Sequence, residues 1–84
     1  MRNKHYSKNK YCKDFPKIRL IVLNSDNYKC QKCNKDGNTV HHIDYNPQNN
    51  KRNNLITLCM RCNIIVNTNR DYWYAYFTYI KENK

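Results

Sequence analysis

The sequence predicts a small α+β fold in which two short strands and three helices are stapled by a metal ion. Two Cys-x2-Cys pairs, Cys30/Cys33 and Cys59/Cys62, have the spacing that a tetrahedral zinc ion needs, because each tight turn directs two thiolates at one point. Short segments rich in β-branched and apolar residues lie between the pairs. Apolar residues at helical spacing occur before the first pair and after the second.

The first helix is expected to begin at Asp14, a residue type that caps helix N-termini, with Pro16 tolerated in the first turn. Its apolar residues recur on one face and are Phe15, Ile18, Ile21 and Val22. The helix should end between Asn24 and Asn27.

Two strands and a polar loop follow this helix. The turn-forming residues 34–38 let the chain double back from the first cysteine pair into a strand over 39–43. Residues 44–53 are expected to form a loop, because Asn46-Pro47 starts a turn and the rest offers little to bury. The second strand, 54–58, is apolar enough to pack inward and leads directly into Cys59.

Two helices are predicted to end the chain, over 60–66 and 71–81, with a break at 67–69. The apolar positions of the last helix are Tyr72, Trp73, Tyr76, Phe77 and Ile80. Their helical spacing is typical of a stripe that faces a core. The alternative is an exposed stripe that stacks on nucleic-acid bases.

The four paired cysteines could hold a structural zinc ion, form two disulfides or be unrelated buried thiols of a small core. Residues 1–11 are polar and basic and lack the apolar segment of a secretory signal peptide, which favours zinc. A chain of 84 residues with 39% apolar residues has a thin core, and domains of this size commonly need such a staple. The fifth cysteine, Cys12, fits no ligand spacing and is interpreted as a free thiol or a small buried side chain.

The chain is strongly basic, with a formal net charge of +10. After four thiolates and one zinc ion are counted the charge is still about +8, which favours a polyanionic partner. No segment approaches the roughly 20 apolar residues of a membrane-spanning helix, so we expect a cytoplasmic protein without a membrane partner. Residues 1–13 are expected to form a basic arm that follows a phosphate backbone, or else a solvated tail, and residues 14–84 a single domain.

The order of these motifs resembles the HNH endonuclease family, which folds as a ββα-metal (His-Me finger) motif. The resemblance covers residues 17–67 and rests on three segments, 28–33, 40–44 and 54–63. It implies the zinc-knuckle subtype with asparagine at the third motif position. Residues 67–77 also look like the tail of small phage-type members.

The resemblance implies roles for single residues. His42 matches the general base, and His41, which precedes it, matches the first ligand of the catalytic metal. Asn54 matches the asparagine that fixes the loop so that the base is oriented. Asn63 stands where many members carry a histidine ligand, although an active subgroup has asparagine there. The family places the histidine pair at a strand end, which answers the objection that neighbouring strand residues face opposite sides. Outside the motif, Asp44 is expected to be a solvent-facing carboxylate, with orientation of His42 as the alternative.

The expected activity is metal-dependent hydrolysis of DNA to 5′-phosphate and 3′-hydroxyl ends. Histidine, with an ordinary pKa near 6.5, can deprotonate a water at neutral pH. Neutral ligands such as His41 and Asn63 leave the ion its full charge, and an imidazole ligand favours Mn²⁺ or Ni²⁺ at least as much as Mg²⁺. One site per chain predicts nicking of double-stranded DNA by the monomer. The expected phosphate contacts are Lys4, Lys8, Lys10, Lys13, Lys17, Lys51, Arg52 and Arg70.

Two other functions fit parts of the pattern. Composition and cysteine pairs alone fit a non-catalytic zinc-ribbon module that binds nucleic acid, and an RNase or toxin could share the fold. The series His42, Asn54, Asn63 favours the nuclease, since a binding module has no need to keep it. Cutting both strands would need a homodimer or two encounters. We expect low sequence specificity or an accessory protein, and a phage-encoded origin in a bacterial host fits this expectation.

Overall fold

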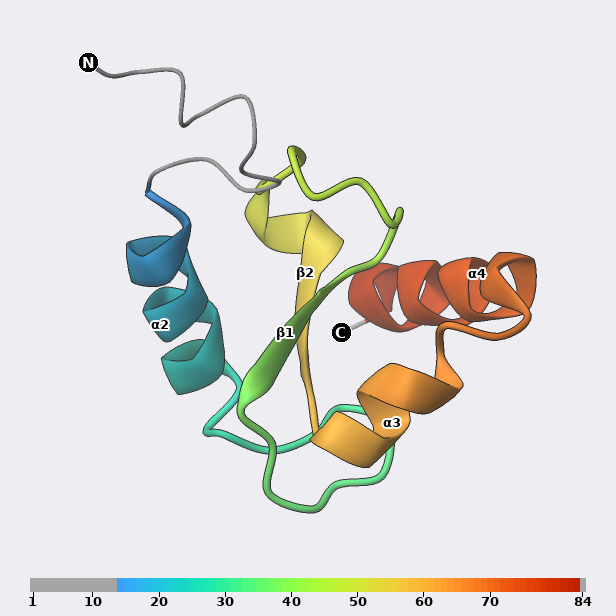
Figure 1. Ribbon diagram of the computed structural model, residues 1–84, viewed down its shortest axis with the longest axis horizontal. Coiled ribbons are helices and arrows are strands. Elements are labelled where there is room, and N and C mark those ends of the chain that lie inside the picture. Colours follow the sequence, from blue (N-terminus) through green and yellow to red (C-terminus); the bar gives the residue numbers. More distant parts are fainter. Residues whose placement is uncertain (1–13, 84) are drawn as a thin grey trace.

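The computed structural model describes residues 14–83, which form a two-stranded antiparallel sheet flanked by helices (Figure 1). In chain order the elements are helix α2 (Phe15–Ser25), strand β1 (Thr39–His42), the short 3-10 helix η1 (Arg52–Asn54), strand β2 (Leu55–Leu58), helix α3 (Met60–Ile65) and helix α4 (Arg70–Glu82). A small α+β fold is therefore confirmed. The basic arm, residues 1–13, lies outside the described residues. No helix within 14–83 is both long enough and apolar enough to cross a membrane.

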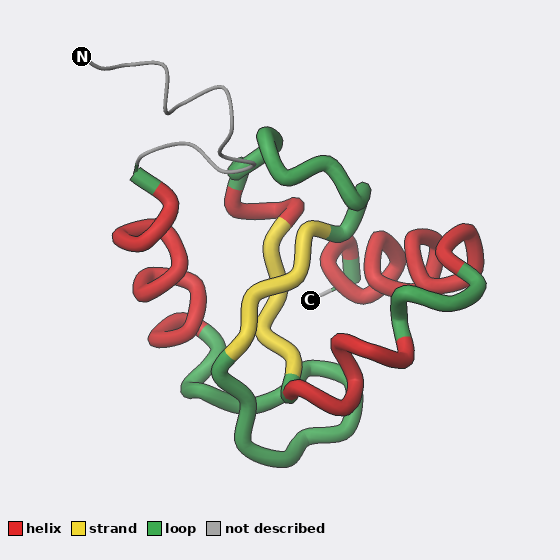
Figure 2. Tube along the Cα trace, in the orientation of Figure 1, coloured by secondary structure: helices red, strands yellow, loops and turns green. Residues whose placement is uncertain are grey.

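The main departure from the predicted elements lies at the end of the polar loop. Residues 52–54 form η1 instead of continuing as loop, because the N–H groups of Asn54 and Leu55 bond to the carbonyls of Lys51 and Arg52. The second strand consequently starts at Leu55, one residue later than predicted. Figure 2 shows η1 leading directly into β2.

The pairing of the two strands separates the two groups of polar residues that the sequence singled out. Thr39 pairs with Leu58 at one end of the sheet, and His42 pairs with Leu55 at the other. Cys59 follows Leu58 directly, so the cysteines gather at the first end and the histidine pair closes the second. Side chains of paired residues share a face, and neighbours along a strand alternate.

Helix α2 covers one face of this sheet, and its buried side chains differ from those predicted. Val22 and Leu23 are buried at 2% and 1% exposure, whereas Ile21 is 48% exposed. The inward stripe therefore runs through Leu23 and on to Asp26, whose carboxylate accepts a hydrogen bond from the Thr57 N–H at 3.0 Å. Asp14 stands at the N-cap position, but its side chain makes no capping hydrogen bond.

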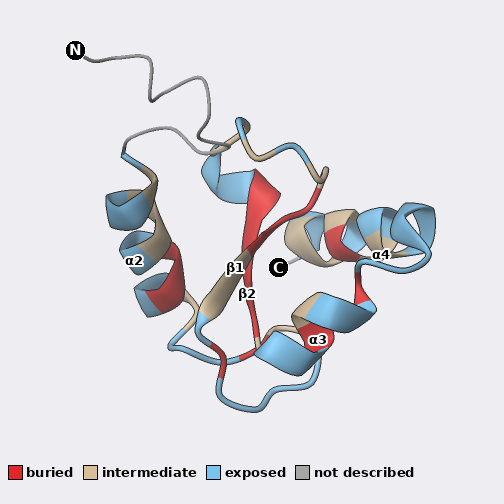
Figure 3. Ribbon diagram, viewed as in Figure 1, coloured by how far each residue is buried: buried red, intermediate tan, exposed pale blue. Residues whose placement is uncertain are grey.

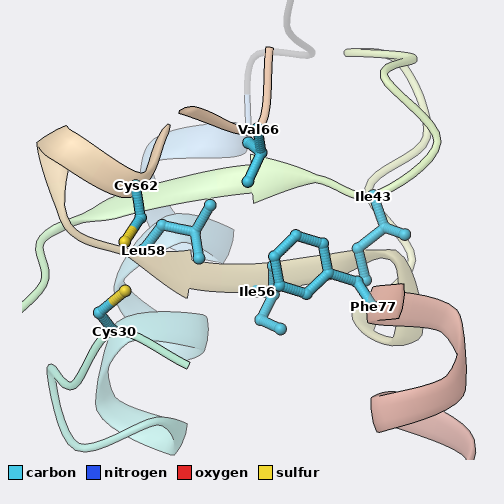
Figure 4. Close-up of a cluster of buried hydrophobic side chains, with 7 residues drawn as sticks. All are labelled: Cys30, Ile43, Ile56, Leu58, Cys62, Val66 and Phe77. Atoms are coloured by element: carbon cyan, nitrogen blue, oxygen red, sulfur yellow. The ribbon is translucent and has the colours of Figure 1, made fainter. Parts of the chain in front are cut away.

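The opposite face of the sheet carries the main apolar core (Figure 4). Its buried members are Cys30, Ile43, Ile56, Leu58, Cys62, Val66 and Phe77. Helix α4 contributes Phe77, which is fully buried, and Trp73, Tyr76 and Ile80 pack against the cluster. Tyr72 is 54% exposed and lies outside the core. The aromatic stripe is thus a core stripe as predicted, except at its first position.

Figure 3 shows that β2 is buried along its whole length. All residues of β2 are buried, because α2 packs on the face of Leu55 and Thr57 while the core cluster packs on Ile56 and Leu58. Lys32, in the first cysteine turn, places its ammonium group 5.0 Å from the ring centre of Trp73. This cation–π contact ties the cysteine turn to α4.

Candidate active site

Four cysteine sulfur atoms converge at the Thr39/Leu58 end of the sheet. The sulfur atoms of Cys30, Cys33, Cys59 and Cys62 all lie within 4.8 Å of one another, and all four thiols are free. The Cys33 and Cys59 sulfur atoms are 3.8 Å apart. A tetrahedral zinc ion with Zn–S bonds of about 2.3 Å separates its sulfur ligands by about 3.8 Å. The site can therefore bind a metal ion such as zinc.

Backbone N–H groups point at the sulfur atoms in both turns. The Cys33 N–H donates to the Cys30 sulfur at 3.5 Å, and the Cys62 N–H donates to the Cys59 sulfur at 3.4 Å. Burial raises the pKa of the Cys30 thiol, but backbone hydrogen bonds from Cys33, Cys59 and Lys32, in that order, lower it to about 6. Burial and the neighbouring sulfur atoms raise the pKa of Cys62 to about 12. Thiolates this close repel one another, and a bound cation would remove that conflict.

Gly37 lets the first cysteine turn approach the end of β2. A Cβ atom at this position would lie 3.0 Å from the carbonyl carbon and oxygen of Leu58 and 3.1 Å from the Cys30 nitrogen. Backbone atoms cannot swing aside as a side chain can. The single glycine of the chain therefore stands where the two halves of the cysteine site meet.

A separate polar pocket of about 350 Å³ opens at the other end of the sheet. Its lining residues are Val40, His41, His42, Tyr45, Pro47, Asn63, Asn67 and Arg70. The structure thus brings together the two histidines, Asn63 and Arg70. No carboxylate appears among these lining residues of the described chain, so the pocket is neutral to positive in character.

His41 has the properties of a neutral imidazole ligand. It is 6% exposed, and its Nε2 atom has no hydrogen-bond partner among residues 14–83. Its ring lies edge-on to the ring of Tyr45, with the two ring centres 4.8 Å apart. The ring centres of His41 and Phe77 are 5.8 Å apart. Burial, followed by the charges of His42 and Arg70, lowers the pKa of His41 to about 4, although Asp44 acts in the opposite direction. The ring is therefore neutral at pH 7. Its orphaned nitrogen fits a metal ligand.

His42 ends β1 and packs in the opposite direction. Its ring stacks on Phe15 of α2 with ring centres 5.4 Å apart, while His41 faces α4, as strand alternation requires. The end of the strand therefore does not turn both rings to one side, as the resemblance implied, although both residues border the pocket. The Nε2 atom of His42 lies 2.8 Å from the Asn50 side-chain oxygen. An amide oxygen only accepts, so Nε2 carries the proton and Nδ1 is the basic nitrogen of the neutral ring.

Asn54 lies outside the pocket and fixes the loop that follows His42. Its side-chain nitrogen donates to Asp44 Oδ1 and to the Asn49 carbonyl, both at 2.9 Å. Its side-chain oxygen accepts the Asp44 N–H at 3.0 Å. Asn54 is 8% exposed, so these three bonds are largely shielded from water. This is the loop-fixing arrangement that the resemblance implied for the residue.

Asp44 was expected to face solvent, and the structure shows it half-buried, with its carboxylate hydrogen-bonded within the loop. Its carboxylate accepts hydrogen bonds from Asn49 Nδ2 at 2.8 Å, the Asn46 N–H at 2.9 Å and Asn54 Nδ2. Partial burial raises the pKa of Asp44, but these donors, Asn49 first, lower it overall. Asp44 therefore anchors the loop from within.

Replacing Asn54 by alanine should destabilise the protein by about 1–3 kcal/mol, because the Asp44 carboxylate and N–H and the Asn49 carbonyl lose buried partners together. Urea denaturation followed by circular dichroism measures this change. Asn53→Ala is the matched control, since Asn53 is an exposed neighbour in the same short helix and should leave the midpoint unchanged. Equal midpoints for the two variants would contradict the anchoring role.

The predicted phosphate contacts divide into three groups. Arg70 borders the pocket, whereas Lys17, Lys51 and Arg52 are exposed and do not line it. The residues Lys4, Lys8, Lys10 and Lys13 lie outside the described part of the chain. The structure therefore places Arg70, and not Lys51 or Arg52, beside the histidines.

Three residues of the site escaped sequence reasoning. Tyr45 and Asn67 line the pocket, and Asn50 holds the His42 ring. Tyr45 adopts a left-handed conformation with φ of 62°, which is unusual for an aromatic residue. Asn50 belongs to a run of asparagines that has no distinguishing pattern.

Comparison of the chain with family models, curated proteins and solved structures yields no match.

Proposed function

We propose that this chain is a metal-dependent endonuclease of the HNH, ββα-metal type that hydrolyses phosphodiester bonds of double-stranded DNA and nicks one strand per encounter. The observation that carries the proposal is the pocket in which His41, His42 and Asn63 meet without any carboxylate among the described lining residues. A neutral or positive pocket suits an anionic substrate. The net charge of +10 favours the same partner.

The residues of the pocket divide the chemistry between them. His42, held by Asn50 and stacked on Phe15, would take a proton from the attacking water through Nδ1. His41 and Asn63 would hold a divalent ion such as Mn²⁺, Ni²⁺ or Mg²⁺, and the orphaned Nε2 of His41 supports this fit. When bound, such an ion supplies positive charge at the phosphate as charge develops there.

The remaining parts of the site act as supports. Asn54 fixes residues 44–50 and thereby the partner of His42. The four-cysteine site would hold a structural zinc ion that fixes the other end of the strands. Neither support lines the polar pocket.

A plasmid assay tests the proposal. Supercoiled DNA is incubated with zinc-loaded protein in Mn²⁺, Ni²⁺ or Mg²⁺. A parallel sample contains protein that has been dialysed free of added divalent ions, and the zinc content of this protein is checked. Nicked circles should appear before linear DNA, at least as fast in Mn²⁺ or Ni²⁺ as in Mg²⁺, and not without an added ion.

Two results would redirect the assignment. If the protein binds DNA but the DNA stays intact in every ion, the non-catalytic zinc-ribbon module is the assignment that remains. Cleavage of RNA with intact duplex DNA at the same salt concentration would indicate an RNase or toxin of the same fold.

A further inference from the structure

Arg70 is held in a fixed position at the rim of the polar pocket by two side chains. Its guanidinium carbon lies 4.6 Å from the ring centre of Tyr45. Its Nη2 group donates to the Asn67 side-chain oxygen at 3.2 Å. A stacked guanidinium keeps its edge and remaining N–H groups available, because the aromatic ring covers only one flat face. Arg70 is exposed at the rim, and these two contacts orient its guanidinium.

Tyr45 in turn is fixed by contacts of both its hydroxyl and its ring. The hydroxyl donates to the Val66 carbonyl at 2.5 Å, which ties the loop after β1 to the end of α3. The ring meets His41 edge-on, so one aromatic ring touches both the candidate metal ligand and the arginine. The left-handed backbone, φ 62°, is the local strain that this placement requires.

The charges around Arg70 suit an anion. Its own positive charge contributes to keeping His41 neutral, and no acid lines the pocket within the described residues. A planar guanidinium presents two parallel N–H donors, which match two oxygens of one phosphate group. The pocket thus combines a candidate base, candidate neutral metal ligands and one oriented guanidinium group that can bind a phosphate.

We propose that Arg70 binds the phosphate group that is to be cut, and that Tyr45 is the positioning residue that orients Arg70 toward it. This inference rests on the proposed function for the identity of the phosphodiester. It goes further by assigning one arginine out of a strongly basic chain. Because the ring of Tyr45 stacks on the Arg70 guanidinium, its effect on phosphate binding should pass through Arg70.

Binding of a fluorescein-labelled 20-base-pair duplex, measured by anisotropy without added divalent ions, tests the assignment apart from cleavage. Arg70→Ala should weaken binding about tenfold and reduce the slope of log K against log salt by about 0.9, the value for one phosphate contact. Arg61→Ala is the matched control, because Arg61 is exposed on α3, carries the same charge and does not line the pocket. It should change binding less than twofold.

A double-mutant cycle tests the role of Tyr45. Tyr45→Leu should weaken binding on its own, and should have no further effect in the Arg70→Ala background. A purely structural role would instead lower binding by the same factor in both backgrounds. Arg70→Lys, which keeps the charge but loses the planar fork, should restore less than half of the lost binding free energy. Urea midpoints of all variants show that each is folded.

The outcomes separate this inference from the nuclease assignment. Equal loss of binding in Arg70→Ala and Arg61→Ala would overturn the role of Arg70, even if the protein nicks DNA. Selective loss in Arg70→Ala, with no cleavage in any ion, would support Arg70 as the phosphate-binding residue while overturning the nuclease.

Discussion

Replacing Cys62 by serine will leave the chain largely unfolded at 25 °C. Cys62 is 3% exposed, and together with Cys30 it forms part of the core cluster itself. A two-stranded sheet is marginal without support. Structural zinc contributes an apparent binding free energy of about 10–16 kcal/mol in small zinc domains, which equals or exceeds the whole stability of a typical domain. Losing one sulfur ligand should therefore remove the folded state.

Circular dichroism and fluorescence measure this loss. The chain has a single tryptophan, Trp73, which packs against the core and lies under the ammonium group of Lys32. Its emission should shift to the red in Cys62→Ser, and equally when a strong chelator removes zinc from the wild type. Cys12→Ser, at the one cysteine that belongs to neither Cys-x2-Cys pair, should retain the wild-type zinc content and midpoint. Cooperative unfolding of metal-free Cys62→Ser at the wild-type midpoint would refute a structural metal.

Replacing His42 by alanine should slow plasmid nicking by about 10²–10⁴-fold, the usual contribution of a general base. The variant keeps His41 and Asn63, so loss of the water-activating nitrogen is the expected cause. The first-order rate at saturating DNA is the quantity to compare, because it is insensitive to weaker binding. His5→Ala, in the basic arm, is the matched control and should nick at the wild-type rate.

Loss of packing could also lower activity in His42→Ala, since the ring stacks on Phe15. His42→Gln separates the two causes. Glutamine keeps a polar side chain of similar length but cannot take up a proton from water, so its nicking rate should fall as far as that of alanine while its urea midpoint stays nearer the wild type. Nicking at the wild-type rate by either variant would exclude His42 as the base.

The sequence predicts the elements of this fold well because their signals are local. Strand 39–43 and helix 60–66 are bounded by cysteine turns, and each lies within one residue of the observed element. The buried face of α2 could not be predicted with the same certainty. Ile21 and Leu23 are equally apolar, and only the position of the sheet decides that Leu23 is covered while Ile21 stays 48% exposed.

The same distinction applies to the candidate site. The residues brought together at the pocket, His41, His42 and Asn63, belong to motifs with recognisable spacing. Tyr45 could not be predicted, because its role depends on a left-handed backbone that tyrosine rarely adopts. The Asn50 contact with His42 depends on how Asn54 and Asp44 fold the loop, and such side-chain to backbone networks leave no periodic pattern.

The antiparallel register has a consequence for redesign. Sulfur atoms fasten one end of the hairpin, and closing a longer loop at the other end costs only about 0.6 kcal/mol of entropy for each doubling of a flexible connection. The main cost of an insertion there is instead the loss of the hydrogen bonds by which Asp44 and Asn54 hold residues 46 and 49. Pro47 borders the pocket, so a segment inserted after it would emerge at the pocket rim. A peptide grafted at that point would displace Asn50 and with it the support of the His42 ring, so DNA recognition and the proposed cleavage could not be varied independently at this turn.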